Sequence, residues 1–173
     1  MSMTAGIRKP SPLKLLLDTN VWLDYFLARS ALHRQVTELV TKTWQSEDVA
    51  LCAASLSLKD VAFLLERDLK NQARASGEDI TPSVTAAAKE AAWGCVRSIC
   101  DLALIVPVGH AEVMQAFTYK GVHHDFEDDL ILSAAARAET DLIVTHDQEL
   151  ARHSPLPCSG VDGALEVLVA RGL

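Results

Sequence analysis

The amino-acid sequence predicts an α/β fold, a three-layer α/β/α sandwich around a mainly parallel central sheet of four to five strands. Two observations predict it. Short apolar runs alternate with longer segments of helical periodicity along the chain, which is the pattern of α/β folds. The runs Leu15–Leu17 and Leu142–Val144 are apolar at every position. Both faces of these strands are therefore expected to be covered by helices, as in parallel sheets.

Length and composition are those of one globular domain. The chain has 173 residues, of which 49% are hydrophobic, and this is enough for a single core. Residues 1–12 are expected to form a flexible N-terminal lead-in, and residues 13–173 a single domain. No apolar run approaches the ~20 residues that cross a bilayer, and the N-terminus lacks the pattern of a signal peptide. We therefore expect a cytoplasmic protein that makes no membrane contact.

Charge, cysteines and tryptophans narrow the function classes. The net charge of −7 counts against nucleic-acid binding by charge alone, for which a basic surface is typical. The four cysteines form no CxxC pair, Cys52 lies between two apolar residues and Cys100 follows Ile99, so we expect buried thiols rather than zinc ligands or disulfides. Trp22, Trp44 and Trp93 are expected to pack within the protein rather than to stack on bases.

The expected elements of the amino-terminal half follow from apolar spacing and N-cap residues. In order, they are a strand at 13–17, a helix capped by Asn20 and ending at Leu27, a helix starting at Ser30 or Ala31, a strand at 49–53, and a helix capped by Ser55 or Ser57 that continues to Ala75. A polar break at 76–79 ends this half.

The carboxy-terminal half continues the alternation. In order, we expect a helix opened by Thr81-Pro82 and reaching Cys100, a strand at 104–106, a helix at 111–119, a loop at 121–125, a helix at 126–139, a strand at 142–145, a short helix from Gln148, a small strand near Cys158 and a last helix from Asp162. Proline suits the first position of a helix, and the alanine run 86–88 is strongly helical.

Four carboxylates are placed to meet at one edge of this sheet. Asp18 and Asp147 follow the first and fourth strands, and Asp60 lies in the first turns of the helix after the second. In open α/β sheets, ligands bind beyond the carboxyl ends of the strands. Asp128 shares a helical face with the apolar residues Ile131, Leu132 and Ala135. A carboxylate on such a face is costly unless it has a partner.

Crowded carboxylates raise one another's pKa, and a hard divalent cation that prefers oxygen ligands, Mg²⁺ or Mn²⁺, removes this conflict. Such a site can activate a water molecule and neutralise charge on a phosphodiester. No cysteine or lysine stands where a covalent nucleophile is expected. Attack by metal-activated water is therefore the favoured chemistry.

Three blocks of the sequence together resemble the PIN domain: LLLDTNVWLDYF, SLSLKDVAFLL and DFEDDLILSAAARAETDLIVTHDQEL. This family of Mg²⁺/Mn²⁺-dependent ribonucleases includes the toxins of VapBC-type toxin–antitoxin pairs. The resemblance covers about Leu13–Leu150. It implies a PIN-like fold, an endoribonuclease that hydrolyses RNA phosphodiesters, an antitoxin protein as partner, and a homodimer.

The resemblance also implies roles for individual residues. Asp18, Asp128 and Asp147 match the family's metal-binding acids. Asn20 and Thr145 match its supporting polar residues, and Asp125 is a candidate outer ligand from the preceding loop. Asp60 stands where the family usually has the longer glutamate, so it acts through a water or does not touch the metal. Glu66, two turns on, is a weaker substitute.

Simpler interpretations stay open for each acid. Asp18 and Asp147 could each be helix N-caps, and Asp128 and Asp60 ordinary acids at the start of a helix. Asp128 is preferred to Asp129 because the latter shares its stripe with Ser133 and Arg137, which predicts a more solvated face. The histidines are expected to be solvated loop residues rather than transition-metal ligands: His123, His124 and His146.

Two other functions remain. The first is a PIN-like module that has lost catalysis and acts as a binding or regulatory partner. The second, a phosphatase with a strand-end D-x-D motif, is disfavoured because Asn20 stands where the second acid is needed. The segment 76–99 is longer than the smallest family members need, and is expected to shape substrate entry or a dimer contact.

Overall fold

A computed structural model describes residues 11–121 and 125–173. Its sheet has five strands in the order β3-β2-β1-β4-β5, and all four neighbouring pairs are parallel. The strands are β1 (Leu13–Leu17), β2 (Val49–Ala54), β3 (Ala103–Val106), β4 (Leu142–Val144) and β5 (Cys158–Ser159). The predicted fold class and the strand positions are thus confirmed, to within about a residue at the strand ends. Most of the expected lead-in, residues 1–10, lies outside the described residues.

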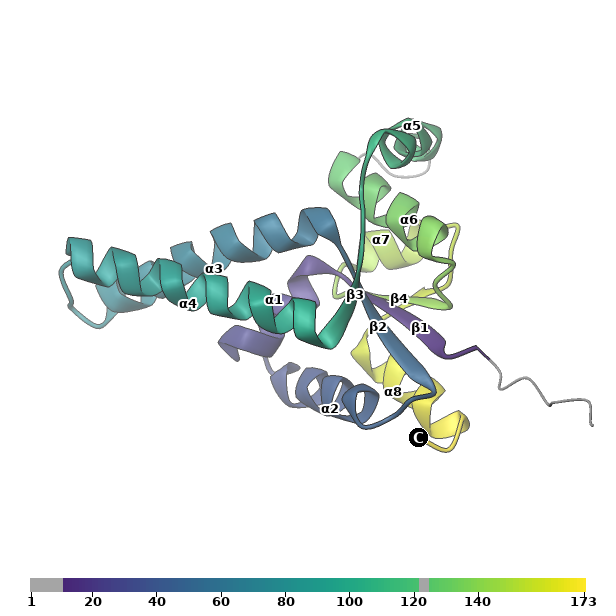
Figure 1. Cartoon of the computed structure of the whole chain (residues 1–173), viewed down its shortest axis with the longest axis horizontal. Coiled ribbons are helices and arrows are strands. Elements are labelled where there is room, and N and C mark those ends of the chain that lie inside the picture. Colours follow the sequence, from purple (N-terminus) through teal and green to yellow (C-terminus); the bar gives the residue numbers. More distant parts are fainter. Residues whose placement is uncertain (1–10, 122–124) are drawn as a thin grey trace, which may run out of the picture.

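Eight helices lie in the described part of the chain. They are α1 (Thr19–Leu27), α2 (His33–Trp44), α3 (Ser55–Ala75), α4 (Pro82–Leu102), α5 (His110–Tyr119), α6 (Phe126–Ala138), α7 (Gln148–His153) and α8 (Val161–Ala170). Figure 1 shows α3 and α4 as a long antiparallel pair that projects from the sheet. No described helix is long and apolar enough to cross a membrane.

Three helix starts differ from the prediction. The N-cap of α1 is Asp18, not Asn20, because Asp18 keeps an extended backbone and accepts a hydrogen bond from the Thr19 amide. Helix α2 begins at His33, since the Ser30 hydroxyl is used in the preceding turn, where it accepts from the Leu32 amide. Helix α3 begins directly at Ser55, whose hydroxyl accepts from the Val108 amide instead of capping the helix.

The two faces of the sheet carry separate cores. Leu15 and Leu17 of β1 belong to the core covered by α1, α2, α8 and the base of α3 and α4. Leu16 points to the opposite face, where it packs with Ile131 of α6 and Leu150 of α7. Figure 1 shows α2 and α8 on one side of the sheet and α5 and α6 on the other. Both faces are covered, as expected for a parallel sheet.

Two packing predictions are wrong. Trp22 is fully buried, as predicted, but Trp44 and Trp93 are 65% and 63% exposed. Trp44 is the last residue of α2, and Trp93 lies in the middle of α4. Cys52 is buried, as predicted, but Cys100 is exposed near the end of α4, so the prediction of a buried thiol is wrong there.

The chain reverses direction across the sheet at β1. From β1 it moves outward through β2 to β3, then crosses by α5 and α6 to β4 on the other side of β1. The carboxyl ends of β1 and β4 are therefore the topological switch point, where open α/β sheets bind their ligands. Leu17 pairs with Val144, and the Asp18 amide donates to the Val144 carbonyl at 3.0 Å. This register sets Asp18 beside Thr145.

Candidate metal centre

Asp18 is the centre of the polar cluster at the switch point. It is 6% exposed, and its two carboxylate oxygens accept three hydrogen bonds. The Thr19 amide donates to Oδ1 at 2.6 Å. The Asn20 amide group donates to Oδ2 at 2.8 Å, and the Thr145 hydroxyl donates to the same oxygen at 2.7 Å. The carboxylate is thereby fixed by donors from α1 and from the end of β4.

Thr145 joins three parts of the cluster through one hydroxyl. It donates to Asp18 and accepts from the Asn20 side chain at 3.1 Å and from the Asp147 backbone amide at 3.0 Å. A hydroxyl has one donor and two acceptor positions, so all of its capacity is used. Thr145 is 2% exposed. The structure thus brings Asn20 and Thr145, the two expected supporting residues, into contact with Asp18.

The ionised form of Asp18 is held in a costly environment. Burial raises the pKa of this carboxyl above its usual value, and the negative charge of Asp147 raises it further. The hydrogen bonds from Thr145, Thr19 and Asn20 act in the opposite direction but do not cancel these effects. A positive ion beside Asp18 would relieve this cost.

Asp128 and Asp147 lie in the same neighbourhood. Burial raises the pKa of the Cys158 thiol on β5 to about 11, and the charges of Asp18, Asp128 and Asp147 add to the effect. All three predicted metal-binding acids are therefore close enough to Cys158 for their charges to affect its thiol. Asp128 is half-buried, and its neighbours Ile131 and Leu132 on the same face are fully buried, as predicted.

Asp147 and Asp125 both cap helices. Asp147 is exposed, and its Oδ1 accepts from the Glu149 and Leu150 amides at 2.7 and 3.1 Å. Asp125 accepts from the Glu127 amide at 2.8 Å and caps α6. The N-cap interpretation is thus correct for Asp18 and Asp147. It does not exclude metal binding, because the Asp147 cap uses only one of the two carboxylate oxygens.

Asp60 lies in the second turn of α3 and is half-buried. Its Oδ1 pairs with the Lys59 ammonium at 2.7 Å. Glu127 lies close enough to both Asp60 and Asp18 to be affected by their charges. Partial burial raises the pKa of Glu127, and the charges of Asp60, Asp18 and Asp125 raise it further. Glu66 pairs with Lys70 at 2.7 Å, farther along α3. Among the described residues, no hydrogen bond or ion pair joins Asp60 to Asp18, so its role remains a prediction.

Two premises drawn from the sequence are wrong. Asp129 and Ser133 are 3% and 0% exposed, so their stripe is buried and not solvated. The reason is that α6 packs against α5 on this side as well as against the sheet. His146 is not a solvated loop residue either: its ring nitrogen Nε2 is buried and lies 3.0 Å from Asp24 Oδ2. His123 and His124 lie outside the described residues.

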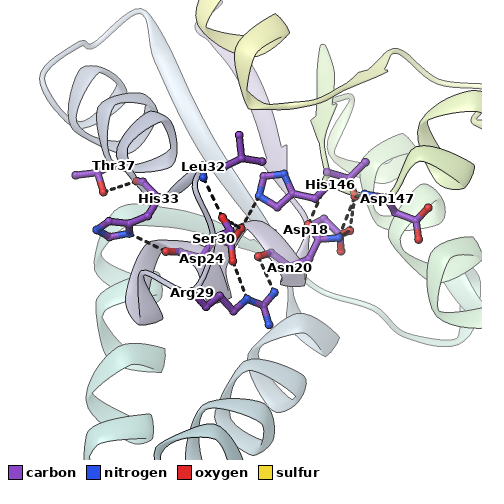
Figure 2. Close-up of polar contacts among 11 residues, drawn as sticks. Asp18, Asn20, Asp24, Arg29, Ser30, Leu32, His33, Thr37, His146 and Asp147 are labelled. Carbon is purple, nitrogen blue, oxygen red and sulfur yellow. Dashed lines mark hydrogen bonds and ion pairs between the residues drawn. The ribbon is translucent and has the colours of Figure 1, made fainter. Parts of the chain in front are cut away.

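Sequence reasoning missed Asp24 and Glu127. Asp24 is 3% exposed and binds Arg29, Ser30 and His146, which Figure 2 shows beside Asn20 and Asp18. Asp24 follows Asn20 by four residues, which places both on one face of the same helix, and this spacing is the signal that could have identified it. Glu127 stands in the acidic run at the start of α6, where acidic residues are favoured whether or not they serve a site.

We call the acidic site at the carboxyl ends of β1 and β4 the Asp18 corner. The chemistry of its candidate ligands fits a hard divalent cation. Every candidate ligand is a carboxylate or amide oxygen, which Mg²⁺ and Mn²⁺ prefer. Burial first, and then the charge of Asp147, raise the pKa of Asp18, and a bound cation would offset both effects. Within residues 11–121 and 125–173, no three His, Cys, Asp or Glu side chains already stand close enough to share an ion. Binding would therefore require the exposed carboxylates to turn inward.

Comparisons with known proteins agree with the fold. VapC20 of Mycobacterium tuberculosis, described as a Sarcin-Ricin loop cleaving toxin, is 15% identical with a TM-score of 0.58, covering 80% of this chain and 93% of that one. VapBC2 from Rickettsia felis, bound to a DNA fragment from its promoter, is 15% identical with a TM-score of 0.55 over 86% and 98% of the two chains. VapBC-1 from nontypeable Haemophilus influenzae is 11% identical with a TM-score of 0.56 over 87% and 99%.

At these identities the structural likeness shows the fold alone. A comparison with curated proteins found no match. The family model described as the PIN domain matches residues 14–149, which is most of the chain and includes both strand ends of the acidic corner. The chain therefore belongs to the PIN domain family.

Proposed function

We propose that this chain is a Mg²⁺- or Mn²⁺-dependent endoribonuclease that hydrolyses RNA phosphodiesters. The observation that carries the proposal is Asp18, a buried carboxylate at the switch point whose pKa is raised by burial and by Asp147. Membership of the PIN domain family supports it. A buried acid with a perturbed pKa beside a specific charge partner is a common mark of a functional site.

Asp18, Asp128 and Asp147 would hold the ion, and Asn20 and Thr145 would keep the Asp18 carboxylate in place. A bound ion supplies an activated water molecule and neutralises charge on the phosphodiester. Asp125 and Asp60 flank this set, and Glu127 adds a further carboxylate near Asp18 and Asp60. Thr145 and Asn20 donate to Asp18, which favours its ionised form.

We further propose that the protein is the toxin of a toxin–antitoxin pair in the cytoplasm, works as a homodimer, and is held by an antitoxin protein. Two of the similar structures bear the name VapBC, and VapC20 is described as a toxin that cleaves the Sarcin-Ricin loop. Co-expression with any small gene that lies immediately upstream of its own, followed by size-exclusion chromatography, tests the partner. Elution of the chain alone would contradict it.

Cleavage of end-labelled RNA tests the enzymatic activity. Wild-type protein with Mn²⁺ should cut the RNA, and EDTA should stop it. Asp18→Asn should slow cleavage by about a hundredfold or more, because a bound ion contributes several kcal/mol to the transition state. Asp101→Asn is the matched control, since Asp101 is exposed near the end of α4. Equal cleavage by both variants would defeat the proposal.

The second candidate is a PIN domain that binds partners without catalysis. Asp60, paired with Lys59 where the family usually has glutamate, favours it. Calorimetric titration with Mn²⁺ separates the two. The nuclease proposal expects binding that is lost in Asp18→Asn and Asp147→Asn, whereas a degenerate site binds no Mn²⁺ through these residues.

A further inference from the structure

We propose that Asp24 is a positioning residue for the Asp18 corner, acting on Asn20 through His146 and Arg29. The inference deepens the proposed function and rests on it for the metal, but the geometry of the network stands by itself. Asp24 lies one turn after Asn20 on α1, and 3% of it is exposed. Its carboxylate is bound by Arg29, Ser30 and His146 rather than by Asp18 or Thr145, so its effect must pass through other residues.

The Asp24 carboxylate on α1 contacts side chains from two other segments of the chain. Its Oδ1 accepts from Arg29 Nε at 2.6 Å, and its Oδ2 accepts from the Ser30 hydroxyl at 2.7 Å. Oδ2 also lies 3.0 Å from His146 Nε2. Helix α1, the turn before α2 and the loop after β4 are thus tied to one carboxylate, as Figure 2 shows.

Two of these partners continue to Asn20. Arg29 Nη2 donates to the Asn20 carbonyl at 3.3 Å, and the His146 backbone amide donates to Asn20 Oδ1 at 3.1 Å. The other end of the Asn20 amide, Nδ2, donates to Asp18 Oδ2 and Thr145 Oγ1. A continuous chain of contacts therefore leads from Asp24 to the Asp18 carboxylate.

The orientation of the Asn20 amide is the step that matters. An amide has an acceptor oxygen and a donor nitrogen at its two ends. As long as the His146 amide holds Oδ1, Nδ2 must face Asp18. If His146 shifts, Asn20 Oδ1 loses this hydrogen bond, and only the contacts of Nδ2 with Asp18 and Thr145 still orient the amide. His146 also lies between Thr145 and Asp147, so the same shift would move both neighbours.

A role in stability alone does not account for this arrangement. Burial raises the pKa of Asp24. The hydrogen bonds from Arg29 and Ser30, with the charges of Arg29 and His146, together lower it by more than burial raises it, so the pKa of Asp24 lies below its usual value. Asp24 is therefore a buried, ionised group. Buried ion pairs contribute little net stability compared with apolar packing, whereas they can fix one arrangement of their neighbours.

The test compares Asp24→Asn with Glu112→Gln. Glu112 is a matched control because it is also a buried acid paired with an arginine, Arg137, but this pair joins α5 to α6. The first readout needs no metal: the side-chain amide signal of Asn20 in ¹H–¹⁵N NMR spectra. We expect slow exchange of its protons with water in wild type and Glu112→Gln, and loss of this protection in Asp24→Asn.

The second readout is Mn²⁺ affinity by calorimetry without RNA. We expect Asp24→Asn to weaken Mn²⁺ binding by about tenfold or more, as substitutions of residues that orient metal ligands usually do. Glu112→Gln should leave the affinity unchanged. If Asp24→Asn does not fold, His146→Ala removes the same link from a side chain that is 18% exposed, and should give the same signals.

Unchanged Asn20 protection in Asp24→Asn and His146→Ala would overturn the inference. So would equal losses of Mn²⁺ affinity in Asp24→Asn and Glu112→Gln, because general destabilisation would then suffice. If the wild type binds no Mn²⁺, the proposed function fails, while the NMR comparison still decides whether Asp24 positions Asn20.

Discussion

Asp18 is both a helix N-cap and a candidate metal ligand, two roles that the sequence analysis treated as alternatives. Its Oδ1 caps α1 through the Thr19 amide, and its Oδ2 is held by Asn20 and Thr145. The cap explains why a carboxylate can stand at the end of a buried strand. The raised pKa indicates that the cap does not fully compensate burial. We therefore regard the N-cap as the device that positions Asp18, and a cation as the partner that completes its environment.

The Thr145 hydroxyl is the most direct point at which to test this network. Thr145→Val keeps the shape of the side chain but removes all three hydrogen bonds, whereas Thr145→Ser keeps the hydroxyl. Valine should weaken Mn²⁺ binding by about 10- to 100-fold, in the range for groups that hold a ligand, and serine should have little effect. Calorimetry on the two variants checks this. Equal affinities would mean that the hydroxyl does not position Asp18.

Single residues were predictable where local pattern decides their place. Asp18 and Thr145 stand at the ends of apolar strands, and a parallel sheet aligns those ends. The link between Asp24 and His146 joins residues far apart in the sequence, and only tertiary packing reveals it. The choice between Asp128 and Asp129 had the same difficulty, because the packing of α5 against α6 buries a stripe that periodicity alone assigned to solvent.

At the scale of elements, α1 and the turn after it act as one unit. Arg29 and Ser30 fold back onto Asp24, and the His33 ring nitrogen Nδ1 lies 2.8 Å from the Asp24 carbonyl oxygen. This use of Ser30 delays the start of α2 to His33. The sequence predicted that a helix would form here, but its boundary depended on side-chain contacts that no local propensity encodes.

The Asp24 carboxylate gives this unit a pH dependence. Its pKa is lowered in the folded protein, so its contribution to stability is present above the unfolded value near 3.8 and is lost as the pH falls through the lower folded pKa. Urea unfolding at pH 7 and pH 3 measures this. The stability gap between wild type and Asp24→Asn should be larger at pH 7. A gap that stays constant would show that the charge of Asp24 does not stabilise the fold.

The pair formed by α3 and α4 accounts for the long segment 76–99. That segment supplies the turn and most of α4, with Ala92 and Ile99 buried against the core. Phe63 and Trp93 are both 63% exposed on the same pair of helices. The expectation that this segment shapes substrate entry or a dimer contact stays a prediction.

At the scale of the whole molecule, topology brings the acids together. β1 and β4 are adjacent although more than a hundred residues separate them, and the crossover through α5 and α6 carries Asp128 to the same edge. The alternation of strands and helices was enough to predict this layout. It was not enough to predict how far the carboxylates stand apart, because that depends on side-chain conformations at the exposed edge.

The central claim is that this corner binds a divalent cation, and anomalous diffraction from crystals soaked in Mn²⁺ tests it most directly. We expect a Mn²⁺ peak bound by Asp18 together with Asp128 or Asp147, and its disappearance in crystals of Asp18→Asn. A well-ordered corner without any Mn²⁺ peak, or a peak that survives in Asp18→Asn, would contradict the account.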